Sequence, residues 1–172
     1  MTAALHVPVK PALPMLPRLA AAILPVAATA VIGSLATTPN IEGWYAGLTK
    51  PSFNPPNWVF PVAWAILDTM IAFSLWRLLG AKPITGPSVR GWWLALAAFA
   101  AQLVLNAAWT PTFFAAHAIG LGLLVVIALL VMVLWTIRLS WRFDRLSAWL
   151  LVPYAAWVSF ATLLTAAIWR LN

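Results

Sequence analysis

The 172-residue chain contains no cysteine, and it has only three acidic residues and two histidines. The lack of cysteine excludes disulfides, thiol nucleophiles and thiolate-bound metals. Two imidazoles and three carboxylates also argue against a metal site built by the protein and against a catalytic triad. We therefore expect neither catalytic residues nor metal ligands in this sequence.

Charge of either sign is scarce as well. Charged residues make up 8% of the chain and hydrophobic residues 64%, whereas a soluble domain carries roughly 25% charged residues. Such a chain cannot cover itself with polar surface, so we expect it to fold within a lipid bilayer. The net charge of +7 is accordingly interpreted as an orientation signal and not as a site for nucleic acid.

Long apolar runs are what the sequence has in abundance. Each approaches the ~20 residues that a helix needs to cross the hydrocarbon core of a membrane. The runs lack the alternation of β-strands, and open sheet edges are not tolerated in lipid. The prediction is an all-α integral membrane protein, a single bundle of five transmembrane helices over residues 18–172. Its spans are predicted at about residues 19–36, 58–79, 91–114, 118–137 and 146–169.

The segment before the first span, residues 1–17, is rich in proline and is predicted to be a disordered tail. The first span also has basic residues before it and small residues after it, as a cleaved signal peptide would. The long proline-rich tail argues against cleavage. We expect the first span to be retained, with a cleaved leader as the alternative.

Lysine and arginine are divided unequally between the two sides of the predicted bundle, eight against two. Because positive residues favour the cytoplasmic side, the N-terminus and the connections between spans two and three and spans four and five are expected in the cytoplasm. This orientation assumes a bacterial inner membrane. The two residues on the other side are Lys50 and Arg170.

The connection at residues 37–57 is the longest between spans, and its sequence KPSFNPPNWVFPVAW continues into the second span. Proline fixes φ and forces the preceding residue into extended geometry, so residues 50–56 are expected to form a stiff, non-helical strap. Asn57 can cap the second span, and Pro61 suits its first turn. The connection is either an aromatic belt at the membrane surface or a lid over a cavity between helices. The proposed lid residues are Trp44, Tyr45, Pro55, Pro56 and Trp58.

Polar residues at membrane depth mark a second group of candidates. Asp68 lies near the middle of the second span, one turn after Trp64, where a carboxylate costs about 2.5–3.5 kcal/mol. It must face the bundle interior or water, or be protonated. Asp68 is either a neutral structural acid or a group that faces a ligand or carries a proton.

The third and fifth spans carry comparable patterns. Gln102, Asn106 and Trp109 follow one stripe of the third span, and Trp157 and Ala161 share a face of the fifth. The amides could join helices to one another, or they could form a polar spot in an apolar pocket. The small Ala161 could serve close helix packing, or it could leave room for a flat ligand beside the Trp157 indole.

Three separated motifs together resemble the translocator protein family, which includes the bacterial tryptophan-rich sensory proteins and the mammalian peripheral benzodiazepine receptor. They are WYAGLTKPSFNPPNWVFPVAW at 44–64, QLVLNAAWTPTFF at 102–114 and PYAAWVSFAT at 153–162. The resemblance implies a five-helix bundle, usually a homodimer, with a lid loop over an apolar pocket. It also implies binding of porphyrins, including protoporphyrin IX, and of isoquinoline-carboxamide ligands.

By this resemblance the pocket uses Trp64, Asn106, Trp109, Trp157 and Ala161, with Asp68 on the same wall and Gln102 on the stripe of Asn106. Two positions depart from the family. Asp68 stands where relatives carry an aromatic residue, which favours a more polar or cationic guest. The sequence Thr165-Ala166 replaces the Asn-Tyr pair of mammalian members, so cholesterol is not an expected partner.

The resulting hypothesis is a membrane receptor or carrier that binds protoporphyrin IX or a haem-like tetrapyrrole as its ligand, with no obligatory cofactor. Its expected partners are the bilayer and a second copy of the chain, and not nucleic acid. Two alternatives remain open. The protein could support light-dependent porphyrin breakdown, or it could be a proton-coupled transporter of amphiphiles built around Asp68.

Overall fold

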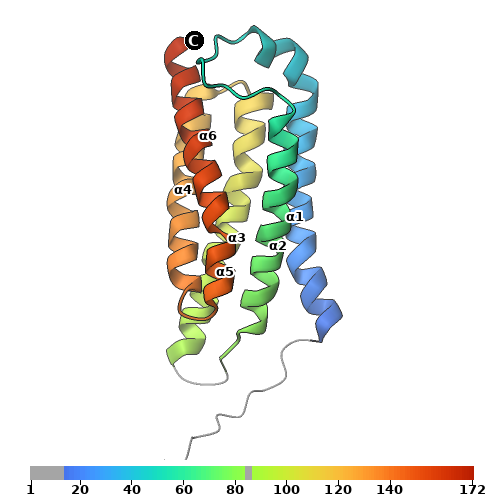
Figure 1. The fold of residues 1–172 in the computed structure, drawn as a ribbon, viewed down its shortest axis with the longest axis vertical. Helices are drawn as coiled ribbons and strands as arrows, with labels where there is room; N and C mark the ends of the chain where they lie inside the picture. Colours follow the sequence, from blue (N-terminus) through green and yellow to red (C-terminus); the bar gives the residue numbers. More distant parts are fainter. Residues whose placement is uncertain (1–13, 84–86) are drawn as a thin grey trace, which may run out of the picture.

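The computed structural model of this chain describes residues 14–83 and 87–172, and all regular structure in these ranges is helical. Five of the described helical segments are long and apolar enough to cross a membrane. They stand side by side as one elongated bundle (Figure 1). The prediction of an all-α membrane protein with five spans is therefore confirmed.

The observed helices follow the predicted spans closely. The fifth span is divided at Leu151 into two helices, and Pro153 lies in the first turn of the second, where its missing N–H costs no helical bond. The predicted tail falls largely on residues 1–13, which lie outside the described residues. The helices are α1 Met15–Thr37, α2 Val59–Gly80, α3 Pro87–Thr110, α4 Ile119–Ser140, α5 Arg145–Leu150 and α6 Val152–Leu171.

The bundle has one closely packed half. Its core joins the C-terminal part of α2 and the N-terminal part of α3 to α4 and α6, and it centres on Ile71, Phe99, Leu129 and Tyr154, which are all inaccessible to solvent. The span that begins with α1 is the least buried of the five, and α1 packs mainly against α2 and α3. Helix α1 therefore packs along one side of the other helices.

Hydrogen bonds and an ion pair join α2 to α5 at one end of this core. Ser74 Oγ donates to the Ser147 carbonyl at 2.8 Å, and Ser147 Oγ donates to the Ser74 carbonyl at 2.9 Å. Arg77 pairs with Asp144 at 2.7 Å, and the Asp144 carboxylate also accepts from the Ser147 N–H and so caps α5. This end of the bundle is held by hydrogen bonds as well as by packing.

The connection between α1 and α2 is more helical than expected. The 3₁₀ turn η1 (Thr38–Asn40) and the π-helical turn η2 (Ile41–Tyr45) continue directly from α1, and helical geometry persists to Gly47. Residues 50–56 are non-helical, as the prolines predicted. The expected Asn57 cap does not form, because α2 begins at Val59 after Trp58 without a side-chain cap.

Candidate functional site: a tryptophan-lined cavity

The other half of the bundle is hollow. A cavity of about 550 Å³ lies between α1, α2, α3 and α6, beneath the α1–α2 connection and next to the π-helical turn η3 (Pro111–Ala115). Ligand pockets commonly measure about 300–1,000 Å³ and are mostly apolar with a few polar groups. The volume suits a ligand much larger than water.

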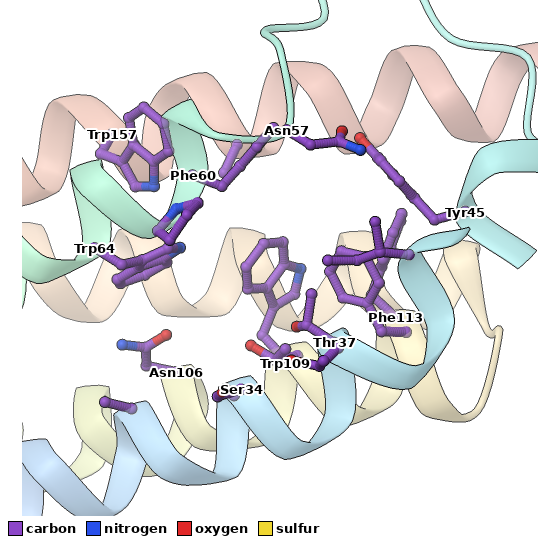
Figure 2. Close-up of a pocket in the computed structure, with 18 of the residues that line it drawn as sticks. Ser34, Thr37, Tyr45, Asn57, Phe60, Trp64, Asn106, Trp109, Phe113 and Trp157 are labelled. Atoms are coloured by element: carbon purple, nitrogen blue, oxygen red, sulfur yellow. The ribbon is translucent and has the colours of Figure 1, made fainter. Parts of the chain in front are cut away.

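Three indoles from three different helices face this cavity. Trp64 extends from α2, Trp109 from α3 and Trp157 from α6, and their rings surround one open space (Figure 2). The Trp64 ring meets Tyr154 edge-on with centroids 6.2 Å apart, and the Trp157 ring meets Phe60 edge-on at 6.0 Å. Edge-to-face pairs restrain the rings, so their apolar surfaces are presented in a fixed arrangement.

A few polar groups interrupt the aromatic lining. Asn106, which is 4% exposed, lies one turn before Trp109 on α3, and Asp68 lies one turn after Trp64 on α2. Both line the cavity, as does Ala161. The structure thus brings together six of the seven residues proposed from sequence as ligand-binding.

Gln102 is the exception. It is fully buried in the bundle and is not among the residues that line the cavity. Neither of its amide atoms has a hydrogen-bonding partner in the described parts of the chain. A regular helix places Gln102 and Asn106 on one stripe. The cavity, however, reaches along α3 only as far as Asn106 and does not extend to Gln102.

The wall formed by α1 was not foreseen from the sequence. Small residues at helical spacing face the cavity there, and Figure 2 shows Ser34 and Thr37 at its edge. A Cβ added at Gly33 would lie 3.6 Å from Thr110 Oγ1, so α1 approaches α3 closely at that point. Alanine, glycine, serine and threonine within an apolar run carry no pattern that distinguishes a pocket wall from ordinary packing. The α1 residues concerned are Thr29, Ala30, Gly33, Ser34 and Thr37.

The segment that covers the cavity also differs in part from the lid predicted from the sequence. Of the proposed lid residues, only Tyr45 lines the cavity; its hydroxyl donates to Asn54 Oδ1 at 2.9 Å, and Lys50 Nζ lies 4.7 Å from its ring centroid. Trp44 instead packs edge-on against Phe113, with centroids 5.4 Å apart. The remaining proposed lid residues, Pro55, Pro56 and Trp58, are not part of the lining.

The connection is also tied to the end of α6. The Thr49 N–H donates to Asn172 Oδ1 at 3.0 Å, and Asn172 Nδ2 donates to the Thr49 carbonyl at 3.0 Å. Figure 1 shows the connection crossing the end of the bundle at which the C-terminus lies. These contacts hold the cover over the cavity at a point far from both α1 and α2.

Comparison with known proteins agrees with this arrangement. The model of the TspO/MBR family matches residues 21–170, which include every residue that lines the cavity. The chain belongs to the TspO/MBR family. It is an integral, multi-pass membrane protein.

Relatives in this family come from bacteria, archaea and mammals. The chain is 42% identical to protein CrtK of Rhodobacter capsulatus, over 75% of this chain and 78% of that one. It is 38% identical to the tryptophan-rich protein TspO of Chlorobaculum tepidum, over 78% and 84% of the two chains. It is 36% identical to the human translocator protein, over 75% of each chain. The resemblance inferred from the three motifs is thereby confirmed.

Proposed function

We propose that this TspO/MBR-family protein binds a flat tetrapyrrole of the porphyrin type in the tryptophan-lined cavity, as a membrane receptor or carrier. The observation that carries the proposal is the convergence of Trp64, Trp109 and Trp157 on one space of about 550 Å³. Indole faces offer large apolar areas that suit a flat conjugated guest. The Asn106 amide would meet a polar edge of the guest and fix its orientation.

The α1–α2 connection supports the same proposal. A tetrapyrrole that entered the cavity would lie beneath Tyr45, whose hydroxyl is already engaged by Asn54. A cover held by hydrogen bonds would slow the escape of an apolar ligand and keep water from its faces.

The experiment is a titration of the purified protein with protoporphyrin IX, followed by the shift of the porphyrin's main absorption band. Trp64→Ala and Trp157→Ala are each expected to weaken binding by about two- to twelvefold, since an aromatic contact contributes about 0.5–1.5 kcal/mol beyond the area it buries. Absorbance is preferable to tryptophan quenching because the variants change the fluorescence itself.

Trp135→Ala is the matched control. Trp135 lies on α4, is half exposed on the outer surface and does not line the cavity, so its loss should leave porphyrin affinity unchanged. Binding curves of Trp64→Ala and Trp157→Ala that superimpose on the wild-type curve would overturn the proposal. So would an equal loss of affinity in Trp135→Ala.

A further inference from the structure

A second space lies on the outside of the bundle, between α1 and α2. This groove has a volume of about 490 Å³ and walls that are almost entirely apolar, including Leu19, Ile23, Ala72, Phe73 and Trp76. Leu19, Ile23 and Phe73 are substantially exposed. In a membrane protein such side chains face acyl chains, so the groove opens toward the lipid.

Asp68 lies between this groove and the tryptophan-lined cavity, and it is the one described residue that lines both. On α2 it is preceded one turn earlier by Trp64, which faces the cavity, and followed one turn later by Ala72, which faces the groove. The carboxyl group therefore stands at the boundary between two apolar spaces of similar size.

No partner within the described ranges neutralises Asp68. Its carboxylate makes no hydrogen bond or ion pair there, and no described lysine, arginine or histidine lines either space. The buried Tyr154 of α6 lies close enough to Asp68 for the two groups to interact electrostatically. A carboxylate in the middle of a span costs about 2.5–3.5 kcal/mol, so this position favours a guest that brings a positive charge.

We propose that Asp68 is the cation-binding subsite for an amphiphilic amine that occupies both spaces. The ammonium group would pair with Asp68, the flat apolar part would lie among the indoles of the cavity, and an alkyl tail would extend along the α1–α2 groove. Trp64 lies one turn before Asp68, and its ring face attracts cations. Trp76, two turns after Asp68, already has the Arg18 guanidinium 4.0 Å from its ring centroid and is left to contact the alkyl tail.

Charge complementarity selects this occupant over others. An acyl chain of a neutral lipid would fill the groove but leave Asp68 unpaired, either as a buried charge or as a protonated acid without a hydrogen-bonding partner, and the apolar face of a second copy of the chain would do the same. An unpaired charge in low dielectric is far more costly than a paired one. The assignment does not depend on tetrapyrrole binding, because its test uses no porphyrin.

The first experiment compares two acridines of nearly equal shape in nanodiscs of zwitterionic lipid. At mildly alkaline pH, 9-aminoacridine is a cation and acridine is uncharged, and binding of each is followed by its fluorescence. The wild-type protein is expected to bind the cation about tenfold more tightly than the neutral compound, which is the scale of one charge-assisted contact. Asp68→Asn, which keeps the shape, should abolish this preference and leave acridine affinity unchanged.

Glu42→Gln is the matched control, because it removes the same charge from an exposed residue that lines neither space. It should retain the full preference for the cation, and any non-specific attraction of the cation to the nanodisc is the same for all three proteins. Equal affinities of the two acridines for the wild-type protein would overturn the proposal. A preference that survives in Asp68→Asn would overturn it as well.

The second experiment tests the groove. An octyl chain on the amino group of 9-aminoacridine should increase affinity for the wild-type protein by at least about tenfold, since two buried methylene groups at about 0.8 kcal/mol each already contribute that much. Ala72→Phe fills the groove without touching the cavity and should remove this gain while leaving 9-aminoacridine binding unchanged. A gain that persists in Ala72→Phe would show that the alkyl chain lies outside the groove, and no gain in the wild type would show that lipid or another chain already occupies it. Either result would overturn the assignment of the groove.

Discussion

The Trp44 indole lies flat on the His117 imidazole, with ring centroids 4.3 Å apart and planes inclined by 13°. Trp44 belongs to the turn that continues from α1, and His117 lies in the turn between η3 and α4. His117 Nε2 also pairs with Asn40 Oδ1 at 3.1 Å. Among the described residues other than glycine, His117 alone has a positive φ, 56°. The turn at His117 therefore holds the start of the α1–α2 connection in two ways, by the ring stack with Trp44 and by the hydrogen bond with Asn40.

The first prediction concerns this stacked pair. His117→Ala should loosen the α1–α2 connection, because it removes a ring contact of about 0.5–1.5 kcal/mol together with the hydrogen bond to Asn40. The expected result is faster hydrogen exchange over residues 44–50, measured by mass spectrometry in detergent. Exchange rates equal to those of the wild type would contradict it.

His117→Gly separates the lost contacts from backbone strain. Glycine adopts positive φ without cost, whereas alanine pays about 1 kcal/mol there. Both variants should expose the connection to exchange, but the glycine variant should unfold at the higher temperature. The reverse order of stability would show that the turn is not strained.

The second prediction concerns the ion pair between Arg77 and Asp144. Burial raises the pKa of the Asp144 carboxyl, but hydrogen bonds from Arg77 and from the Ser147 N–H, together with the Arg77 charge, hold the pKa below its usual value. Asp144→Asn should lower the free energy of unfolding by about 1–3 kcal/mol. Asp144→Ala should cost about 1 kcal/mol more, because asparagine still caps α5 and alanine does not.

The dependence of this effect on pH follows from the lowered pKa. The ionised carboxylate stabilises the folded state fully above the pKa of the unfolded chain, about 3.9, and this contribution is lost as the pH falls through the lower folded pKa. The difference in thermal stability between the wild type and Asp144→Asn should be constant from neutral to mildly acidic pH and shrink only in stronger acid. A difference that disappears near neutrality would contradict the assignment.

The third prediction concerns the reciprocal serine contact between α2 and α5. Ser74→Ala removes the donor to the Ser147 carbonyl inside the core, and it should destabilise the protein by about 0.5–2 kcal/mol, the range for hydrogen bonds between membrane helices. Thermal unfolding in detergent measures the effect. Ser159→Ala is the control, because Ser159 Oγ donates only to the Ala155 carbonyl of its own helix. Equal stability of the two variants would show that the interhelical contact contributes nothing.

The fourth prediction compares two glycines. A Cβ at Gly122 would lie 3.3 Å from Cβ and Cδ2 of Phe113, so Gly122→Ala must displace a ring that lines the cavity; it should cost about 1–3 kcal/mol and weaken ligand binding. A Cβ at Gly33 would make only ordinary contact with Thr110, so Gly33→Ala should be neutral or stabilising by up to about 1 kcal/mol. Calorimetric unfolding of both variants provides the measurement, and a more stable Gly122→Ala would refute it.

Much of the fold follows from hydropathy alone, since a chain with so few charges can satisfy its backbone in lipid only as helices. The helix ends depend on tertiary contacts instead. Helical geometry continues from α1 to Gly47 through a 3₁₀ turn and a π-helical turn, with Pro39 in the first turn of η1. Asn57 does not cap α2, because Trp58 occupies the N-cap position and makes no capping hydrogen bond.

The candidate site was predictable where its residues are chemically conspicuous. Trp64, Asp68, Asn106 and Trp157 stand out in apolar spans, and all four line the cavity. Packing between the helices decides how far the cavity extends along α3. The sequence therefore could not predict that Gln102 is buried outside it. The predicted homodimer and membrane orientation stay predictions.

The wall that α1 contributes has a consequence for how ligand preference can change. Ala30, Gly33 and Ser34 have very short side chains, and each lines the cavity together with the indoles. Single substitutions there would narrow the space by one or a few atoms while every aromatic ring stayed in place. Substitutions on α1 can therefore change the volume of the cavity without changing the aromatic side chains that α2, α3 and α6 place in it.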